Sequence, residues 1–145
     1  CFVRPGEVAL AWTDDAADPQ YARSAAAREV LESATDAKGR SLKVHLVPLP
    51  KPMHATEEEV STIDVSGVAA PREAGTRLAA SYINFYLCNR GLIVPSFDDP
   101  ADQAAQQTLA ALFPDRELVA VPGREILLGG GNIHCITQQQ PTGSE

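Results

Sequence analysis

The 145-residue chain lacks the features that mark several large classes of protein. No apolar run approaches the ~18 residues that a membrane-spanning helix needs, which argues against a transmembrane protein. There is no Asn-x-Ser/Thr glycosylation acceptor and no signal peptide, so we expect a cytoplasmic location. Basic residues are few: 12 Lys and Arg stand against 19 Asp and Glu, giving a net charge of -7. This balance argues against nucleic acid and anionic membranes as partners.

Cysteine is also scarce, and its pattern argues against two kinds of stabilising site. The three cysteines, Cys1, Cys88 and Cys135, are odd in number and have no Cys-x-x-Cys spacing. A disulfide scaffold and a cysteine-bound zinc ion are therefore not expected. The chain begins without Met, inside an apolar run, and we expect it to be a piece of a longer protein. Its length is about that of one domain.

What is present is a tandem pattern of strand and helix signals. Residues 1–49 predict two strands around the turn at residues 4–6 (RPG), then a helix and a third strand. Asp18 is the expected N-cap of that helix, and Pro19 is its expected first residue. The apolar positions of the helix expected to face the core are Ala22, Ala26, Val30 and Leu31.

Residues 77–123 repeat this order, with strands in ASYINFYLC and GLIVPSF around the turn at residues 89–91 (NRG), then a helix and a strand. The second helix is expected to turn Ala105, Leu109 and Leu112 inward. The chain thus predicts an α/β fold of two tandem ββαβ units. Residues 50–76, which join the units, form a charged loop with prolines, either the lid or rim of a site or a disordered segment.

Paired acidic residues support the repeat. Asp14-Asp15 match Asp98-Asp99, and Asp18 matches Asp102, each offset by about 84 residues. Both pairs fall between a strand and a helix, where helix capping explains them. A carboxylate pair that binds a cation is the alternative interpretation.

The segment 124–140 carries the densest group of chemically active residues. An apolar run, ILL, predicts a strand that leads into three glycines, Asn132, His134 and Cys135. Consecutive glycines let the backbone approach a ligand closely, and N–H groups near such a turn lower the pKa of a thiol. Cys135 is therefore either a nucleophile that attacks a planar carbon centre or a buried structural residue after a loop. The residues alone leave both interpretations open.

The other candidate residues have weaker signals. His134 is expected to be a packing neighbour of Cys135, since adjacent residues on an extended chain point to opposite faces. His45 is expected to be half-buried or on the surface, His54 lies in the joining loop, and Cys88 is expected to be structural. Trp12 is interpreted equally well as a core residue or as a ligand contact. No histidine of the chain stands out as the partner of Cys135.

Three stretches of the chain resemble a known family. SYINFYLCNRGLIVPSFDDPADQAA, GGGNIHCITQQQP and CFVRPGEVALAWTDD are similar to the C-terminal part of agmatine deiminases, which belong to the guanidine-modifying superfamily. The resemblance implies a five-bladed α/β propeller of ββαβ units, the pentein fold. Residues 1–145 are then the C-terminal part of one propeller domain, with units at 1–49 and 77–123, a loop at 50–76 and the nucleophile segment at 124–140.

The resemblance also implies an activity, the hydrolysis of agmatine to N-carbamoylputrescine and ammonia in putrescine biosynthesis. It implies no metal and no organic cofactor, agmatine as a small-molecule substrate, and a possible homo-oligomer. Cys135 matches the family's nucleophile, which forms an amidino-cysteine intermediate, and Gly130, Gly131 and Asn132 match positions that shape the site or bind substrate. The family's catalytic His-x-Asp motif would lie upstream of Cys1, so we expect residues 1–145 to be inactive alone.

Three alternatives remain at this point. A related peptidylarginine deiminase would use the same cysteine on protein arginine. A self-processed amidohydrolase would use Cys1 as an N-terminal nucleophile, which the tandem repeat disfavours. A truncated half-propeller would only pair with another chain and would have no activity.

Overall fold

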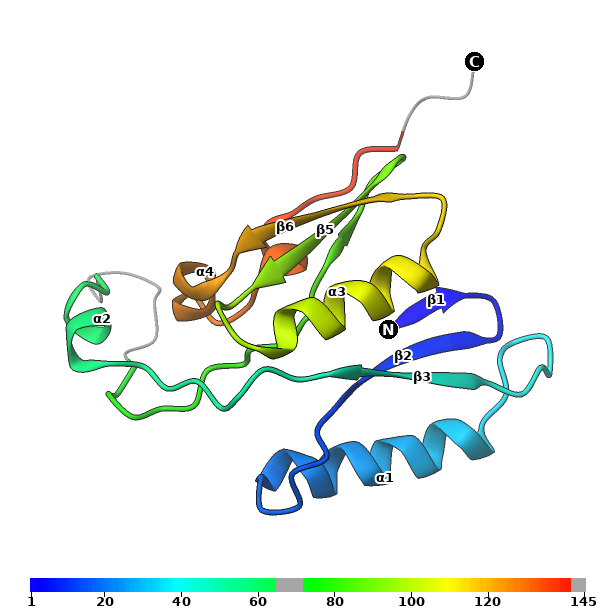
Figure 1. Ribbon diagram of the computed structural model, residues 1–145, viewed down its shortest axis with the longest axis horizontal. Helices are drawn as coiled ribbons and strands as arrows, with labels where there is room; N and C mark the ends of the chain where they lie inside the picture. Colours follow the sequence, from blue (N-terminus) through cyan, green and yellow to red (C-terminus); the bar gives the residue numbers. More distant parts are fainter. Residues whose placement is uncertain (65–71, 142–145) are drawn as a thin grey trace.

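A computed structural model describes residues 1–64 and 72–141 of the chain, which form two three-stranded sheets with helices (Figure 1). In the first sheet, β1 (Phe2–Arg4) is antiparallel to β2 (Glu7–Trp12), and β2 is parallel to β3 (Lys43–Pro48). Helix α1 (Pro19–Ser33) connects the two parallel strands. The first sheet is therefore a ββαβ arrangement, as parallel neighbours need a crossover connection.

The second sheet has the same topology. Strand β4 (Tyr86–Leu87) is antiparallel to β5 (Gly91–Ser96), and β5 is parallel to β6 (Glu117–Pro122). Helix α3 (Ala101–Leu112) makes the crossover. The register of β5 on β6 runs from Gly91 opposite Glu117 to Ser96 opposite Pro122. The protein is thus an α/β fold with two small mixed sheets.

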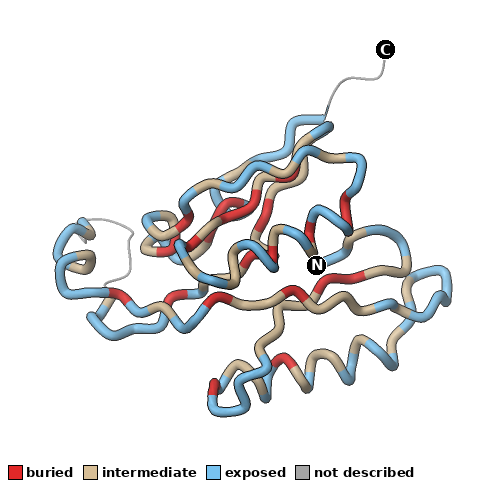
Figure 2. Tube along the Cα trace, viewed as in Figure 1, coloured by how far each residue is buried: buried red, intermediate tan, exposed pale blue. Residues whose placement is uncertain are grey.

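Helix α3 lies between the two sheets and contributes to one shared core (Figures 1 and 2). It contacts β3 of the first sheet and β6 of its own sheet. The expected inward positions Ala105, Leu109 and Leu112 are buried, which confirms that prediction. At the end of α3, the guanidinium of Arg4 donates a hydrogen bond to the carbonyl of Leu112. The two units are therefore packed against each other through α3.

The prediction for the inward face of α1 was wrong. Ala22, Ala26 and Val30 are exposed, and Val30 keeps 65% of its surface. The buried residue of α1 is Ser24, whose hydroxyl donates to the carbonyl of Ala11 at 2.9 Å. This backbone partner satisfies the buried hydroxyl, and the side of α1 that carries Ala22, Ala26 and Val30 faces away from the first sheet, while Leu31 is half-buried.

The start of α1 follows the sequence prediction. Asp18 is the N-cap, its carboxylate accepts from the backbone N–H of Gln20 at 2.8 Å, and Pro19 is the first helical residue. Asp102 matches Asp18 in sequence but has a different role. It lies inside α3 and accepts hydrogen bonds from the buried Tyr82 hydroxyl at 2.6 Å and from the backbone N–H of Phe97. Asp102 therefore joins three segments of the second unit.

The joining segment contains a helix where a loop was expected. Helix α2 (Glu57–Ser61) begins with a capping box, in which Thr56 and Glu59 each accept the other's backbone N–H. Arg124 holds both carboxylate oxygens of Glu59, at 2.6 and 3.1 Å. Further along, the guanidinium of Arg77 holds the carboxylate of Asp18. These ion pairs connect the described parts of 50–76 and the start of the second unit to neighbouring elements. Residues 65–71 of the predicted loop lie outside the described residues.

Within residues 1–64 and 72–141, the helices are too short or too polar to cross a lipid bilayer.

Candidate active site

The polypeptide reaches Cys135 through a short helix rather than the predicted strand. After β6, Gly123 leads into α4 (Arg124–Leu128), and the side chain of Leu127 is buried. Its residues, REILL, include good helix formers, and a helical turn places only part of this apolar run in the core. Arg72 donates from Nε to the carbonyl of Leu128 at 2.6 Å, which fixes the end of α4. The strand prediction for this run was wrong.

Two glycines after α4 make the approach to Cys135 possible. Gly130 has a φ of 99°, a left-handed backbone conformation that residues with a side chain rarely adopt. Gly131 lies against the side chain of Cys135: a Cβ atom at this position would be 2.6 Å from both Cβ and Sγ of Cys135. Gly131 is therefore required for the close contact between the turn and the cysteine side chain.

Asn132 closes the turn from the inside. Its side chain is fully buried, its Nδ2 donates to the carbonyl of Gly123 at 3.1 Å, and its Oδ1 accepts from the backbone N–H of Ile133 at 2.9 Å. The second contact caps the short 3-10 helix η1 (Ile133–Ile136), which carries the cysteine. In this arrangement the amide of Asn132 holds the turn. A direct contact between Asn132, Gly130 or Gly131 and a substrate stays a prediction.

Cys135 is a free, exposed thiol that faces a polar side chain of the second unit (Figure 1 shows η1 beside β5). Nδ2 of Asn84 lies 3.4 Å from Sγ of Cys135, and Oδ1 of Asn84 accepts from the backbone N–H of His134 at 2.9 Å. The hydrogen bond from Asn84, followed by the backbone N–H groups of Asn132 and Cys135, lowers the pKa of Cys135 from its ordinary value. These donors favour a thiolate at an accessible position.

Asn84 is a contact of Cys135 that sequence reasoning missed. ASYINFYLC was predicted as a strand, but only Tyr86–Leu87 are strand, and Tyr82 and Ile83 form a turn. The reason is the core, since Tyr82 and Phe85 are both buried and a spacing of three residues places them on one side of a turn. The only signal for Asn84 was its place in the stretch SYINFYLCNRG that carries the family resemblance.

A family model described as Porphyromonas-type peptidyl-arginine deiminase matches residues 1–141. The chain belongs to this family.

Individual relatives show strong similarity to the chain. An agmatine deiminase of Pseudomonas aeruginosa is 60% identical over 141 residues, and one of Pseudomonas putida is 58% identical. Each alignment covers 97% of this chain but 38% of the relative, so the chain spans well under half the length of these curated relatives. Among solved structures, the agmatine deiminase of Enterococcus faecalis superposes with a TM-score of 0.88 at 43% identity, covering 97% of this chain and 38% of that one. The C. jejuni agmatine deiminase gives 0.70 at 25% identity, with coverages of 92% and 33%.

His134 of this family member lies beside the cysteine without bonding to it. The residue belongs to η1, so the extended-chain argument used for its orientation does not apply, and its side chain is exposed. Over the described residues, no hydrogen bond joins the imidazole of His134 to Cys135. His134 instead lines a small pocket of about 280 Å³ with Asn84, Ser81, Ile83 and Cys1. Its interpretation as a neighbour rather than a proton partner agrees with this position.

The remaining candidates lie in other surroundings. His45 is half-buried and its Nε2 lies 2.7 Å from Oε2 of Glu7, and His54 forms a β-bridge with Arg77. Trp12 is half-buried. Its Nε1 donates a hydrogen bond to Asp14 at 2.7 Å, and its ring contacts the ring of Tyr21. None of these residues lines the small pocket beside Cys135.

One carboxylate of each acidic pair accepts a backbone N–H at or just before the start of a helix. Asp15 accepts from the backbone N–H of Ala17, and Asp99 accepts from that of Ala101 at the start of α3. No group of three or more His, Cys, Asp or Glu residues suited to a metal ion is found among residues 1–64 and 72–141. The N-cap residues of α1 and α3 are Asp18 and Pro100, so neither acidic pair supplies the cap itself, and cation binding by a carboxylate pair stays a prediction.

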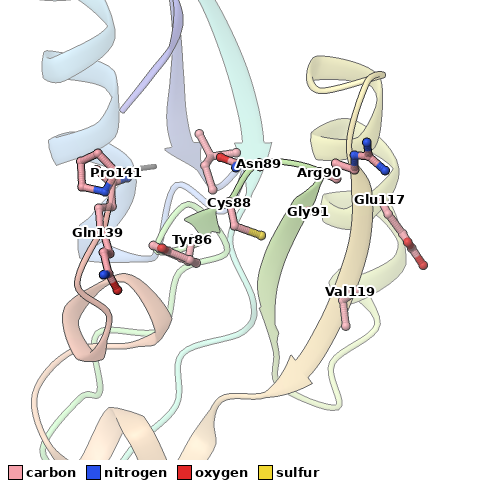
Figure 3. A pocket seen from close by; sticks show the side chains of 11 residues that line it. Tyr86, Cys88, Asn89, Arg90, Gly91, Glu117, Val119, Gln139 and Pro141 are labelled. Atoms are coloured by element: carbon pink, nitrogen blue, oxygen red, sulfur yellow. The ribbon is translucent and has the colours of Figure 1, made fainter. Parts of the chain in front are cut away.

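Cys88 lies in a larger pocket, of about 850 Å³, at the turn between β4 and β5 (Figure 3). Tyr86, Arg90, Glu117 and Val119 also line this pocket. A Cβ on Gly91 would be 2.7 Å from Sγ of Cys88, so the thiol packs against the turn. Cys135 is not among the lining residues, and the pocket is thus distinct from the candidate nucleophile.

Proposed function

We propose that this chain carries the nucleophile of an agmatine deiminase, which hydrolyses agmatine to N-carbamoylputrescine and ammonia. The observation that carries the proposal is the exposed thiol of Cys135, held between Gly131 and Asn84 and surrounded by N–H donors that lower its pKa. The names of the curated relatives, agmatine deiminases at about 60% identity, support agmatine as the substrate.

The proposed chemistry uses Cys135 as a covalent catalyst. The lone pair of the thiolate forms a C–S bond to the guanidinium carbon, and the C–N bond to the terminal amino group breaks, releasing ammonia once that nitrogen is protonated. Water then adds to the amidino-cysteine carbon. The C–S bond breaks, its electron pair returns to sulfur, and N-carbamoylputrescine leaves. No described residue is assigned the proton transfers; we expect them on the His-x-Asp motif that the family resemblance implies upstream of the segment matching Cys1.

The proposal extends to the fold and the setting of the enzyme. A five-bladed propeller of ββαβ units is supported by the two units observed and by α3, which lies between the sheets of both. In such a ring each helix would lie between its own sheet and the next. The role in putrescine biosynthesis, the cytoplasmic location and the homo-oligomer stay predictions, as does the absence of a metal or organic cofactor.

The test is turnover of agmatine by the protein at its full natural length. We expect ammonia and N-carbamoylputrescine in equal amounts and, after acid quenching, an amidino adduct on the peptide that contains Cys135. Cys135→Ser removes the thiol and should lower kcat by roughly 10³-fold or more. Cys88→Ser is the matched control and should keep turnover near the parent value, since Cys88 lines a different pocket. Undiminished turnover in Cys135→Ser would refute the proposal.

A second candidate function is deimination of arginine within peptides. The description of the matching family model favours it, because that family is named for peptidyl-arginine deimination. Comparing kcat/KM for free agmatine with kcat/KM for a blocked peptidyl-arginine separates the two. A higher value for the peptide would replace the first proposal with the second, and no turnover of either would leave a non-catalytic half-propeller.

A further inference from the structure

Asn84 and Cys135 are brought together from positions 51 residues apart in the chain. Asn84 follows the turn at Tyr82 and Ile83, before β4, and η1 packs against β5 of the same sheet. The contact is therefore built by the tertiary fold. It places an uncharged amide, rather than a histidine or a carboxylate, directly on the sulfur.

The orientation of the Asn84 amide is fixed by the backbone. The N–H of His134 points to Oδ1 of Asn84 at 2.9 Å and to the main-chain carbonyl of the same residue at 3.3 Å. Reversing the amide would place its NH₂ group against this N–H, two donors face to face. Oδ1 must therefore face His134, and Nδ2 is left to face Sγ of Cys135 at 3.4 Å.

This arrangement distinguishes the two protonation states of the sulfur. A thiolate accepts a hydrogen bond from an amide N–H strongly, whereas a neutral thiol is a weak acceptor. The thiol could donate to Oδ1 instead, but that distance is longer, 3.8 Å, and Oδ1 is already occupied by His134. The shorter contact, from Nδ2 of Asn84 to Sγ, is thus a hydrogen bond that the thiolate accepts strongly and the neutral thiol accepts only weakly.

We propose that Asn84 is a second catalytic residue, which orients Sγ of Cys135 and donates a hydrogen bond from Nδ2 to its thiolate. This rests on the proposed function and deepens it. In the attack, the sulfur lone pair becomes the C–S bond and the hydrogen bond weakens. When the C–S bond breaks, the electron pair returns to sulfur and the hydrogen bond from Asn84 strengthens again. The amide keeps its protons throughout.

Two variants separate the donor from the rest of the side chain. Asn84→Asp keeps an oxygen for the N–H of His134 but loses the NH₂ donor, so the turn that carries η1 is retained. Asn84→Ala loses both contacts and introduces no charge. Asn89→Asp is the matched control, because it makes the same substitution at an exposed position in the turn between β4 and β5.

The measurement is the pH dependence of alkylation of Cys135 by iodoacetamide in the protein at its full natural length, followed on the Cys135 peptide by mass spectrometry. Both Asn84 variants should shift the profile to higher pH and slow alkylation near pH 7 by about tenfold, as one pKa unit implies. The Asn89→Asp profile should match the parent. Circular dichroism checks folding, and if Asn84→Ala does not fold, Asn84→Asp decides the question.

The outcomes separate this inference from the function on which it rests. Profiles of the Asn84 variants that coincide with the parent would overturn the role of Asn84, even if agmatine turnover is intact. A shifted profile in a protein whose parent does not turn over agmatine would support the contact and reject the substrate. When turnover is present, the Asn84 variants should lower kcat more than they change KM, and the acidic limb of the rate profile should move to higher pH.

Discussion

The sulfur of Cys135 lies between two features from distant parts of the chain, the bare backbone of Gly131 and the amide of Asn84. The first sets how close the sulfur comes to the turn, and the second sets which protonation state is stabilised. Neither contributes a charge of its own. The reactivity of Cys135 therefore depends on the space around its sulfur and on the nearby amide dipole. Single substitutions can change either one without altering the net charge.

Gly131→Ala is predicted to displace the nucleophile. Its new Cβ would lie 2.6 Å from Cβ and Sγ of Cys135, a distance that real Cβ contacts do not reach, so the cysteine must move. A displacement of this kind costs on the order of 10²-fold in kcat/KM, because attack depends on the position of the sulfur. The check is steady-state turnover of agmatine together with the alkylation rate of Cys135.

Gly129→Ala is the control for this prediction. Its backbone has a φ of -75°, which alanine adopts readily, and its nearest contact would be the carbonyl of Ile126 at 3.3 Å. Turnover in Gly129→Ala should stay close to the parent. Equal losses in both variants would show that the glycine turn, rather than the contact of Gly131 with Cys135, controls activity.

At the scale of elements, side chains from outside α2 and α4 hold these two helices in place. α2 is tied to α4 by the Glu59–Arg124 pair, and Arg72 bonds the last carbonyl of α4. The pKa of Glu59 is held at about 2, first by the guanidinium of Arg124 and then by the backbone N–H of Thr56. The glycine turn at residues 129–132 thus follows a helix, α4, that side chains of the joining segment hold in place.

Features that depend only on residues nearby in the sequence were predictable from the sequence. Asp18 and Pro19 form the start of α1 as expected, and the inward row of α3 is correct, because caps and periodicity are local. The helix α4 was missed because a run of three apolar residues has no period. Asn84 was missed because its partner is 51 residues away, and no local pattern encodes such a contact. The cysteine was found through its motif, but its surroundings were not.

Asp18→Asn is predicted to lose stability in a pH-dependent way. The hydrogen bonds from Arg77, then that from Gln20, lower the pKa of Asp18 from 3.8 to about 2. A lowered pKa means that the stabilisation is complete above about pH 5, where the unfolded carboxyl is almost fully ionised, and is lost as the pH falls toward 2. Asparagine still caps the helix but carries no charge for Arg77. At pH 7 the free energy of unfolding should fall by about 1–2 kcal/mol.

Urea unfolding of the parent and of Asp18→Asn, followed by the fluorescence of Trp12, measures this difference. The difference in unfolding free energy should be constant from pH 7 to about pH 5 and shrink between pH 4 and pH 2. The other carboxyls titrate in both proteins and cancel. A difference that is the same at every pH would place the effect on the shape of the side chain rather than on its charge.

At the scale of the whole molecule, the two helices of the repeat differ in what covers them. α3 lies between both sheets and buries Ala105, Leu109 and Leu112, whereas α1 contacts β2 and β3 and leaves Ala22, Ala26 and Val30 exposed. These three are positions that the sequence predicted to be inward. A propeller resolves the difference, since the outer face of α1 would meet the sheet of another ββαβ unit, as α3 meets the first sheet here.

The propeller proposal predicts that Val30 is covered in the protein at its full natural length and open when residues 1–145 are produced alone. Val30→Cys should then react with a thiol reagent at least about tenfold more slowly in the full-length protein, because a buried thiol reacts only after local opening. Lys38→Cys, in the exposed turn after α1, is the control and should react at similar rates in both. The labelled peptides are quantified by mass spectrometry. If Val30→Cys is equally reactive in both lengths, α1 faces solvent in the complete enzyme, and the ring of five units is wrong.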